Sequence, residues 1–523
     1  MRRARFVVML LVASALVVLA AAPVLAVTIV EQRVSPLATH FPQNKQNESP
    51  MAVNPVDPLN AISGANDEIE EPDCTPPSGG PSSCPFVPGI NTTGVYVTTN
   101  GGATWTQQIL HWNSSGLQSD GDPTVAFGPK PDGHGGFTYA NGARAYFASL
   151  AGPLGGCLGC ELNAVAWSDD KGATWSDPVV VSKRANPVDF NDKEAIWADA
   201  NPSSPHFGTV YVSWTLFTGN PLGNFGEANV FSPEPIVIAH STDGGRTWSR
   251  PVKLTPSVNN APVGGRQGST VRTGPDGTVY VFWDGARNFK SAILGARSSN
   301  GGVSFTRPFL VSFKSDNPSP MPGTSFRNNS FPMADVDSSG NVYVTWTNYD
   351  TDAGHGRVML AKSTDHGRNW SVSAAADVAG RSPFYPGVAT NGSDVFIGFA
   401  AIDDVPAGTA PGAGVVAYDS YYVLSTDGGA SFGAPVKISA ASSDPDAATT
   451  NGLTAQFLGD YNGAAAGSDG SFWFSWTDTR NGATCAAIDA WRASGFSTPE
   501  PNIYDSCPPD FGNSDIFVAK VTP

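Results

Sequence analysis

The chain has 523 residues, and its 46 acidic side chains outnumber its 30 basic ones to give a net charge of −16 at pH 7. A chain this acidic is a poor binder of nucleic acid or of an anionic membrane, because like charges repel. Its 57 glycines and 43 prolines, together with the lack of any long stretch of helical periodicity, predict an all-β protein with many turns.

The first 26 residues have the pattern of a secretory signal peptide. Arg2, Arg3 and Arg5 precede an apolar run over residues 6–22, and residues 24–26 (Val-Leu-Ala) suit a small-residue cleavage site. We therefore expect a secreted, extracellular protein that begins at residue 27. An uncleaved N-terminal anchor is the alternative, because the apolar run approaches the length that spans a bilayer. A contact with the membrane is expected only in that case.

An eight-residue pattern recurs along the chain: Ser or Thr, any residue, Asp or Asn, any residue, Gly, any two residues, and an aromatic residue. Its six copies occupy residues 98–105, 168–175, 241–248, 298–305, 363–370 and 425–432. Each copy follows a short alternating apolar run, and most precede a second run, so each is expected to be a hairpin turn. Asp or Asn accepts backbone N–H groups in such a turn, Gly takes positive φ, and the aromatic ring packs between sheets. The pattern, called the box below, therefore predicts a structural turn.

These octapeptides resemble the Asp-box, or BNR repeat, of sialidases and related β-propellers, and the resemblance covers nearly the whole chain after residue 26. The aromatic residues that close successive boxes are 57 to 73 residues apart. Six copies at such spacings indicate a repeat array. The resemblance implies an Asp-box β-propeller of the sialidase superfamily.

Seven repeat units can be counted by their first strands, which start near Glu48, Asp122, Glu194, Arg266, Arg327, Arg381 and Asp460. The unit after the sixth box has strand-like runs at residues 459–466, 471–476 and 515–520, but no box and no fourth strand. The alternating segment 28–35 would supply that strand. We therefore predict one domain, residues 27–523, folded as a seven-bladed β-propeller of four-stranded antiparallel blades and closed by its first strand. Six blades, as in the sialidase catalytic domain, is the alternative.

Four tryptophans recur at the same place in the second strand of their units: Trp214, Trp283, Trp346 and Trp476. We expect them to form the core between blades and not a platform for sugars. The six cysteines of an exported chain point to disulfides. Proximity in the sequence suggests Cys74 with Cys84, Cys157 with Cys160, and Cys485 with Cys507. A redox or metal pair is the alternative for Cys157 and Cys160, but no second such pair and no nearby His supports it.

Charged residues are expected to gather at one face of the ring. The box turns and the tight turns between the first two strands share one face, and the starts of the innermost strands reach the opposite face, called the mouth below. The acidic residues come from four adjacent blades: Asp460 with Tyr461 from blade seven, Glu48 from blade one, Asp122 from blade two, and Asp192 and Glu194 from blade three. Blades four, five and six bring Arg266, Arg327 and Arg381 in that order. If these residues converge, one side of the mouth is acidic and the other is basic.

The resemblance to sialidases implies roles for some of these residues. Sialidases bind the substrate carboxylate with three arginines, use a Tyr paired with Glu as nucleophile, and use an Asp as acid and base. The catalytic candidates are accordingly Glu48, Glu194, Asp460 and Tyr461, with Tyr385 as an alternative tyrosine, and the substrate-binding candidates are Arg266, Arg327, Arg381 and Asp122. Two features depart from the family. Glu48-Ser49-Pro50 stands where the first blade should carry Arg-Ile-Pro, and the three arginines come from consecutive blades.

Four interpretations follow for the mouth. It could be the site of a sialidase-like glycoside hydrolase that acts on anionic glycans, or of a non-catalytic propeller that binds an extracellular glycan or glycoprotein. Glu48, Glu194 and Asp460 could hold Ca²⁺, since oxygen ligands suit that ion. The charges could also pair across the mouth and only fix the blades. No other cofactor is expected, since the seven histidines show no metal-ligand spacing, and we expect a monomer.

Overall fold

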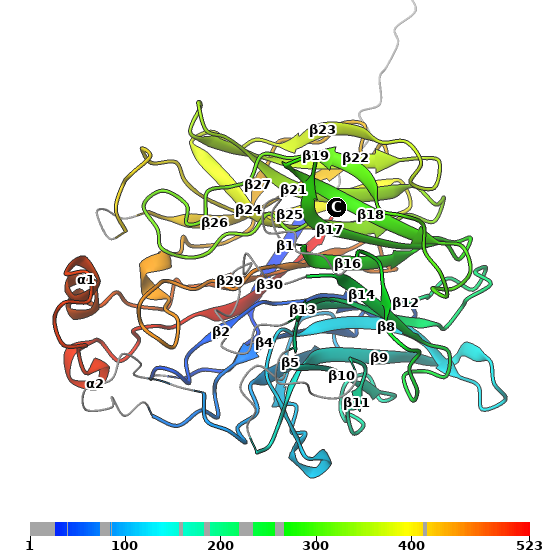
Figure 1. Ribbon diagram of the computed structural model, residues 1–523, viewed down its shortest axis with the longest axis horizontal. Helices are drawn as coiled ribbons and strands as arrows, with labels where there is room; N and C mark the ends of the chain where they lie inside the picture. Colours follow the sequence, from blue (N-terminus) through cyan, green and yellow to red (C-terminus); the bar gives the residue numbers. More distant parts are fainter. Residues whose placement is uncertain are drawn as a thin grey trace, which may run out of the picture.

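The computed structural model describes residues 27–38, 40–73, 84, 86–155, 161–182, 189–218, 234–256, 266–411 and 416–523. The expected signal peptide, residues 1–26, lies outside this part of the chain. Within it, no helix is long and apolar enough to cross a membrane. The described residues form seven antiparallel sheets arranged as the blades of a β-propeller, which confirms the predicted fold (Figure 1).

The strands of each blade follow one another from the innermost outward. Blade one contains β3 (Met51–Val53), β4 (Ala61–Asp67), β5 (Thr93–Thr98) and β6 (Thr106–Ile109), and β2 (Gln46–Asn47) also pairs with β4. Blade two contains β8 (Thr124–Pro131), β9 (Phe137–Pro153), β10 (Leu162–Ser168) and β11 (Val179–Val180), and β7 (Leu117–Ser119) also pairs with β9. Blade three contains β12 (Asp189–Ala198), β13 (Val210–Thr218), β14 (Ile236–Ser241) and β15 (Val252–Lys253).

The next three blades repeat this order without extra strands. Blade four contains β16 (Gln267–Thr273), β17 (Val279–Arg287), β18 (Lys290–Ser298) and β19 (Phe309–Phe313). Blade five contains β20 (Met333–Val336), β21 (Val342–Asp350), β22 (His355–Ser363) and β23 (Ser371–Ala376). Blade six contains β24 (Arg381–Asn391), β25 (Asp394–Asp403), β26 (Tyr418–Ser425) and β27 (Val436–Lys437).

Blade seven is built from both ends of the chain. It contains β28 (Gly463–Ala466), β29 (Phe472–Asp478), β30 (Asp515–Thr522) and, as its outermost strand, β1 (Thr28–Arg33). The pairing of β1 with β30 runs from Thr28 opposite Thr522 to Arg33 opposite Phe517. The predicted closure of the ring by the first strand is therefore confirmed. Closure removes the open edge that the last sheet would otherwise expose.

The box motifs form turns between the third and fourth strands, as predicted from their chemistry. In the copy that joins β14 to β15, the Ser241 hydroxyl accepts a hydrogen bond from the Gly245 N–H at 2.9 Å, and the Asp243 carboxylate accepts one from the Thr247 N–H at 2.9 Å. Gly245 has a φ of 91°, a value that side chains with a Cβ rarely adopt. The chemistry of the turn therefore accounts for the pattern.

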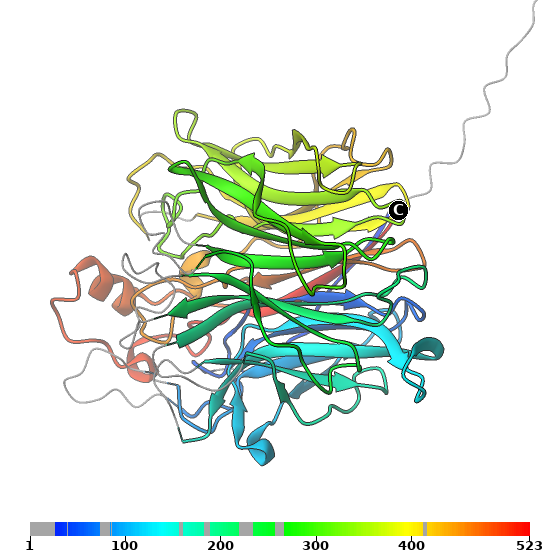
Figure 2. The same ribbon diagram turned by 45° about the vertical axis from the view of Figure 1, so that its right-hand side comes forward.

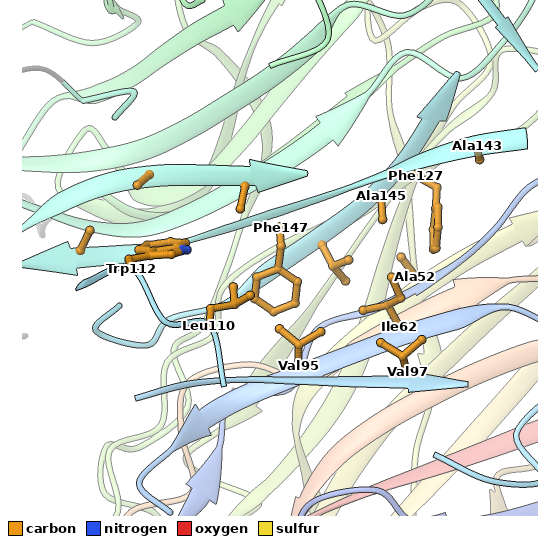
Figure 3. Close-up of a cluster of buried hydrophobic side chains, with 14 of the residues drawn as sticks. Ala52, Ile62, Val95, Val97, Leu110, Trp112, Phe127, Ala143, Ala145 and Phe147 are labelled. Atoms are coloured by element: carbon orange, nitrogen blue, oxygen red, sulfur yellow. The ribbon is translucent and has the colours of Figure 1, made fainter. Parts of the chain in front are cut away.

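The apolar core lies between neighbouring blades. Figure 3 shows one such cluster, in which Val95 and Val97 of blade one lie near Phe127 and Phe147 of blade two. The second-strand tryptophans are all 0–1% exposed, which confirms their prediction as core: Trp214, Trp283, Trp346 and Trp476. Large rings at this position supply much of the apolar area that holds adjacent blades together.

Short helices occur only outside the blades in the described part of the chain. They are the 3₁₀ helices η1 (Asn113–Ser115) and η3 (Pro445–Ala447) and the α-helices α1 (Ala486–Ala493) and α2 (Ile503–Ser506). The two α-helices belong to the insertion between β29 and β30, and Figure 2 shows them on the side of the ring opposite the C-terminus. A disulfide between Cys485 and Cys507 links their ends, as predicted. Cys84 is also disulfide-bonded, whereas Cys74, Cys157 and Cys160 lie outside the described residues.

Candidate functional site

Six charged side chains from five blades form one cluster at the mouth, called the mouth cluster below. They are Glu48 of blade one, Asp122 of blade two, Asp192 and Lys193 of blade three, Arg327 of blade five and Asp460 of blade seven. Glu48, Asp122, Arg327 and Asp460 lie before the first residue of an innermost strand, whereas Asp192 and Lys193 lie within the first half of β12. The expected convergence at this face is therefore observed for Glu48, Asp122, Asp460 and Arg327.

Lys193 lies at the centre of the mouth cluster. Its Nζ is 2.7 Å from Asp122 Oδ2, 2.7 Å from Asp460 Oδ2 and 3.2 Å from Glu48 Oε1. The Lys193 side chain is only 4% exposed, so these ion pairs are largely shielded from water. One ammonium thus joins blade three to blades seven, one and two.

Arg327 forms the outer layer of the cluster. Its Nε and Nη2 donate to the two carboxylate oxygens of Asp460 at 2.7 and 2.6 Å, and Asn329 donates to the same carboxylate at 3.2 Å. The guanidinium also lies 5.0 Å from the centre of the Phe457 ring, a cation–π contact. With 37% of its side chain exposed, Arg327 is the most accessible charged residue of the cluster. A ligand at the mouth would therefore meet Arg327 and Phe457 first.

Two carboxylates of the cluster are held in the ionised form. Burial alone would raise the pKa of Asp460, but Arg327 and Lys193 outweigh it and lower that pKa to about 2. Burial would also raise the pKa of Asp122, but Lys193 lowers it below its ordinary value. Both side chains are therefore negatively charged at neutral pH.

Other carboxyls at the mouth are shifted in the opposite direction. Burial, reinforced by Asp122, raises the pKa of Glu48 well above its ordinary value, and it does the same for Glu194. Burial raises the pKa of Asp192 to about 7, against the opposing effect of Lys193. The Glu48 carboxyl also lies within hydrogen-bonding contact of the Asp122 carboxyl, so protonated Glu48 can donate to ionised Asp122. The mouth therefore combines neutral and charged carboxyls in direct contact.

The backbone that carries these side chains is in a rare conformation. Glu48, Asp122, Lys193 and Tyr385 all have φ between 48° and 61°, although none of them is glycine. In blade three the pairing register also shifts between Asp192 and Ala195, as in a β-bulge. Such left-handed residues and bulges re-aim side chains, and they persist only where surrounding contacts hold them. Here they direct Lys193 into the cluster.

Glu194 and Tyr461 line the mouth end of the central channel. The Glu194 carboxyl is buried, and neither of its oxygens has a hydrogen-bond partner among the described residues. The Tyr461 hydroxyl donates to the Pro123 carbonyl at 2.8 Å. Glu194 is thus a carboxyl of raised pKa that has no hydrogen-bond partner among the described residues, and it lies beside a space that a ligand could enter.

The tyrosine–glutamate pair implied by the resemblance to sialidases is not formed. The Tyr385 hydroxyl donates to the carbonyls of Arg327 and Gly459 at 2.7 and 2.6 Å, and Tyr461 donates to a carbonyl as described above. Neither hydroxyl hydrogen-bonds a carboxyl in the described part of the chain. Burial raises the pKa of both tyrosines well above the ordinary value, so both remain protonated donors.

Two of the predicted arginines lie apart from the mouth cluster. Arg266 donates from Nη1 to the Pro256 carbonyl at 2.9 Å. Arg381 pairs with Asp403 at 2.8 Å and Asp419 at 2.6 Å, both on its own blade. Asp403 ends β25 and Asp419 belongs to β26, so ion pairs with the second and third strands hold Arg381 within its own blade. The expected group of three arginines is therefore reduced to Arg327.

Sequence reasoning missed three contributors to the site: Lys193, Asn329 and Phe457. A signal existed for Lys193, because the run Asp192-Lys193-Glu194 places a cation between two acids at the start of an innermost strand. Lys193 Nζ also occupies the centre of the acidic group that could have held Ca²⁺. Among the described residues, no group of three or more His, Cys, Asp or Glu side chains is arranged to hold a metal ion. The ammonium thus supplies the positive charge there.

No family model matches the sequence, and no curated protein matches it. Among solved structures, the chain is similar to the Hadza microbial sialidase Hz136 at 15% identity and a TM-score of 0.41, with 68% of this chain and 63% of that one covered. It is similar to the leech intramolecular trans-sialidase at 11% identity and a TM-score of 0.41, with 68% and 65% covered. It is similar to the α-L-arabinofuranosidase Arb93A from Fusarium graminearum at 13% identity and a TM-score of 0.43, with 73% of this chain and 93% of that one covered. The chain thus spans less than two thirds of the first two proteins. These similarities are distant, and the fold is assigned from the strand pairing described above.

Proposed function

We propose that this protein is an extracellular, monomeric glycoside hydrolase that works at the mouth of the propeller. The observation that supports this most is the split in acidity among neighbouring carboxyls. The pKa values of Asp122 and Asp460 are lowered, whereas burial raises those of Glu48 and Glu194 well above the ordinary value. Glycoside hydrolysis uses one carboxylic acid to protonate the leaving oxygen and one carboxylate as base or nucleophile.

Accessibility suggests which residues take these roles. We assign the general acid to Glu194, because burial raises its pKa, it has no competing hydrogen-bond partner in the described part of the chain, and it lines the channel at the mouth. We assign the base or nucleophile to Asp122, whose side chain is 13% exposed, against 1% for Asp460. Lys193 keeps Asp122 ionised, so it is a positioning residue in this proposal.

The charge balance at the mouth favours a neutral sugar. Lys193 and Arg327 are matched by ionised Asp122 and Asp460, so no positive charge is left over for an anionic substrate. Arg327 already uses both arms of its fork on Asp460. The half-buried Phe457 can instead stack on a sugar ring, and the half-buried Arg327 can donate to its hydroxyls.

The extracellular setting rests on two observations. Residues 1–26 have the composition of a cleaved signal peptide. The disulfide between Cys485 and Cys507 is typical of an oxidising compartment.

A substrate screen with matched variants tests the proposal. The purified protein from residue 27 is assayed for hydrolysis and binding with neutral polysaccharides and aryl glycosides, and with sialosides, uronic-acid polymers and sulfated glycans. We expect hydrolysis of a neutral glycan, and Glu194→Gln and Asp122→Asn each to lower kcat by about 10²–10⁴-fold. The control is Asp352→Asn, which changes an exposed carboxylate on the hairpin between β21 and β22. Equal activity of Glu194→Gln and the unaltered protein would contradict the assignment.

The second candidate is a propeller that binds a glycan at the mouth without cleaving it. It is favoured by the burial of Glu48 and Asp460, which are 0% and 1% exposed and already paired with Lys193. In that case the mouth cluster would fix the blades, and Arg327 with Phe457 would form the binding surface. Saturable binding without release of reducing sugar, lost in Phe457→Ala, would identify it.

A further inference from the structure

The centre of the ring contains a cavity of about 420 Å³, and Lys193, Glu194 and Tyr461 line its mouth end. Residues of all seven innermost strands line it, and its wall is mostly apolar: Val53, Phe127, Ile196, Met333, Val388 and Ala465 are among them. Its volume lies in the range of about 300–1,000 Å³ that is usual for small-molecule sites. The cavity is thus large enough to hold an organic molecule.

The cavity opens on the face of the box turns. Its lining at the mouth end includes buried Lys193 and Asn462. At the other end, where the innermost strands finish, Ser468 is exposed and Asn391 and Ala200 are half-buried. A ligand can therefore enter from the face of the box turns, and Glu194 lies at the mouth end of the same cavity.

A poorly compensated guanidinium stands in the wall of this cavity. Arg272 donates from Nη1 to the Val271 carbonyl at 2.8 Å and to the Thr270 hydroxyl at 3.3 Å, but its buried Nε has no hydrogen-bond partner among the residues that the structure describes. The nearest carboxylate is that of Asp335, with Oδ1 at 3.7 Å from Nε. Asp335 directs its other oxygen to the Thr390 N–H and hydroxyl, at 2.7 and 2.8 Å.

The surroundings of Arg272 confirm that its charge is only partly balanced. The guanidinium lies 4.3 Å from the centre of the Trp197 ring, which also lines the cavity. Burial lowers the pKa of Arg272, because Asp335 alone compensates for the lost water, and burial raises the pKa of Asp335 itself. A charge in this state gains from an added anion, since isolated buried charges are costly.

We propose that the central cavity binds a small organic monoanion with an apolar body, such as a medium-chain carboxylate. Arg272 holds the carboxylate by charge-assisted hydrogen bonds, which the planar guanidinium can make in pairs. Trp197 supports the guanidinium from one side. The apolar wall formed by Val53, Ile196 and Val388 receives the hydrocarbon part.

Isothermal titration calorimetry with octanoate tests this site. Octanoate is compared with octanamide and octylamine, which have similar bodies but a neutral or cationic head, and with inorganic sulfate, which has no apolar body. We expect saturable binding of one octanoate per chain, and much weaker binding of the other three compounds. Absence of saturable octanoate binding, or equal binding of octanamide or of sulfate, would overturn the proposal.

Two variants separate the role of the charge from that of the cavity. Arg272→Gln removes the charge, and Ala465→Phe fills the cavity without changing Arg272. We expect each to weaken octanoate binding at least about tenfold. Arg266→Gln is the control, since Arg266 does not line the cavity. This variant should bind octanoate as the unaltered protein does. If Arg272→Gln alters thermal stability but Ala465→Phe binds octanoate as the unaltered protein does, Arg272 is only structural and the proposal fails.

Discussion

At the scale of single residues, the mouth depends on the ammonium of Lys193. This group contacts three carboxylates, and it reaches them because Lys193 adopts a φ of 55° within a register shift of β12. Removing one partner of such a buried group costs far more than an exposed ion pair contributes. The same crowding forces some carboxyls to keep their protons. That effect can be measured at Asp192.

Asp192→Asn should stabilise the protein more at high pH than at low pH. Burial raises the pKa of Asp192 to about 7 in the folded protein, whereas an unfolded Asp has a pKa of about 3.9. The folded state thus binds one more proton between these two values, so the natural protein loses stability as the pH rises from about 4 to about 7. Asn resembles protonated Asp and avoids this loss.

Urea unfolding of Asp192→Asn and of the natural protein at pH 4, 5, 6, 7 and 8 measures the effect. The difference in the free energy of unfolding should grow in favour of the variant up to about pH 7 and then level off. The same pair of measurements on Asp352→Asn, at an exposed site, should show no such growth. A difference that is independent of pH would mean that Asp192 is ionised in the folded protein.

At the scale of the elements, the sequence predicts well what depends on local chemistry. Each box contains the residues for its own turn, and the second-strand tryptophans occur at one position of a repeat, so the blades and their core could be predicted. The directions of the side chains at the mouth could not be predicted from the sequence. They depend on left-handed residues such as Lys193 and Tyr385, and a shift of one residue in a strand moves a side chain to its other face. Sequence reasoning therefore placed Arg381 at the mouth and overlooked Lys193.

A pair of glycine substitutions tests how tightly these strand starts pack. Gly459 and Gly470 have nearly equal φ values of 81° and 84°, so alanine should cost about 1–2 kcal/mol of backbone strain at either position. At Gly459 a Cβ would also meet Glu48 Cγ at 2.5 Å, whereas at Gly470 it would meet nothing within 4 Å. Thermal unfolding should therefore show Gly459→Ala as the less stable variant, by about a further 1–3 kcal/mol. Equal melting temperatures would show that Glu48 can move aside at no cost.

At the scale of the whole molecule, the propeller is held together by interfaces between blades and by the pairing of β1 with β30, called the clasp below. Apolar clusters join neighbouring sheets, as Figure 3 shows for blades one and two. Blade seven alone takes strands from distant parts of the chain, because β1 pairs with β30. The stability of the ring should therefore depend on a strand of six residues.

Deleting residues 27–36 should destabilise the entire protein and not blade seven alone. Without β1, β30 becomes an exposed edge strand, and the contacts of blade seven with its neighbours lose support. Calorimetry should show a lower melting temperature for one cooperative transition, and light scattering should show aggregation. The comparison protein begins at residue 27 and lacks only the expected signal peptide. An unchanged melting temperature would argue against the closure.

The clasp also sets an order of events during biosynthesis. A chain made from its N-terminus produces residues 28–33 before the strands of the other six blades, whereas their partners, residues 517–522, are made after those strands. During translation, β1 therefore remains without its partner strand while the strands of the other six blades are made. Contacts between such distant segments form slowly, and an unpaired strand is prone to pair wrongly. Closure of the ring is therefore a late step in folding. A chain whose synthesis stops before residue 517 lacks the partner of β1 and cannot close the ring.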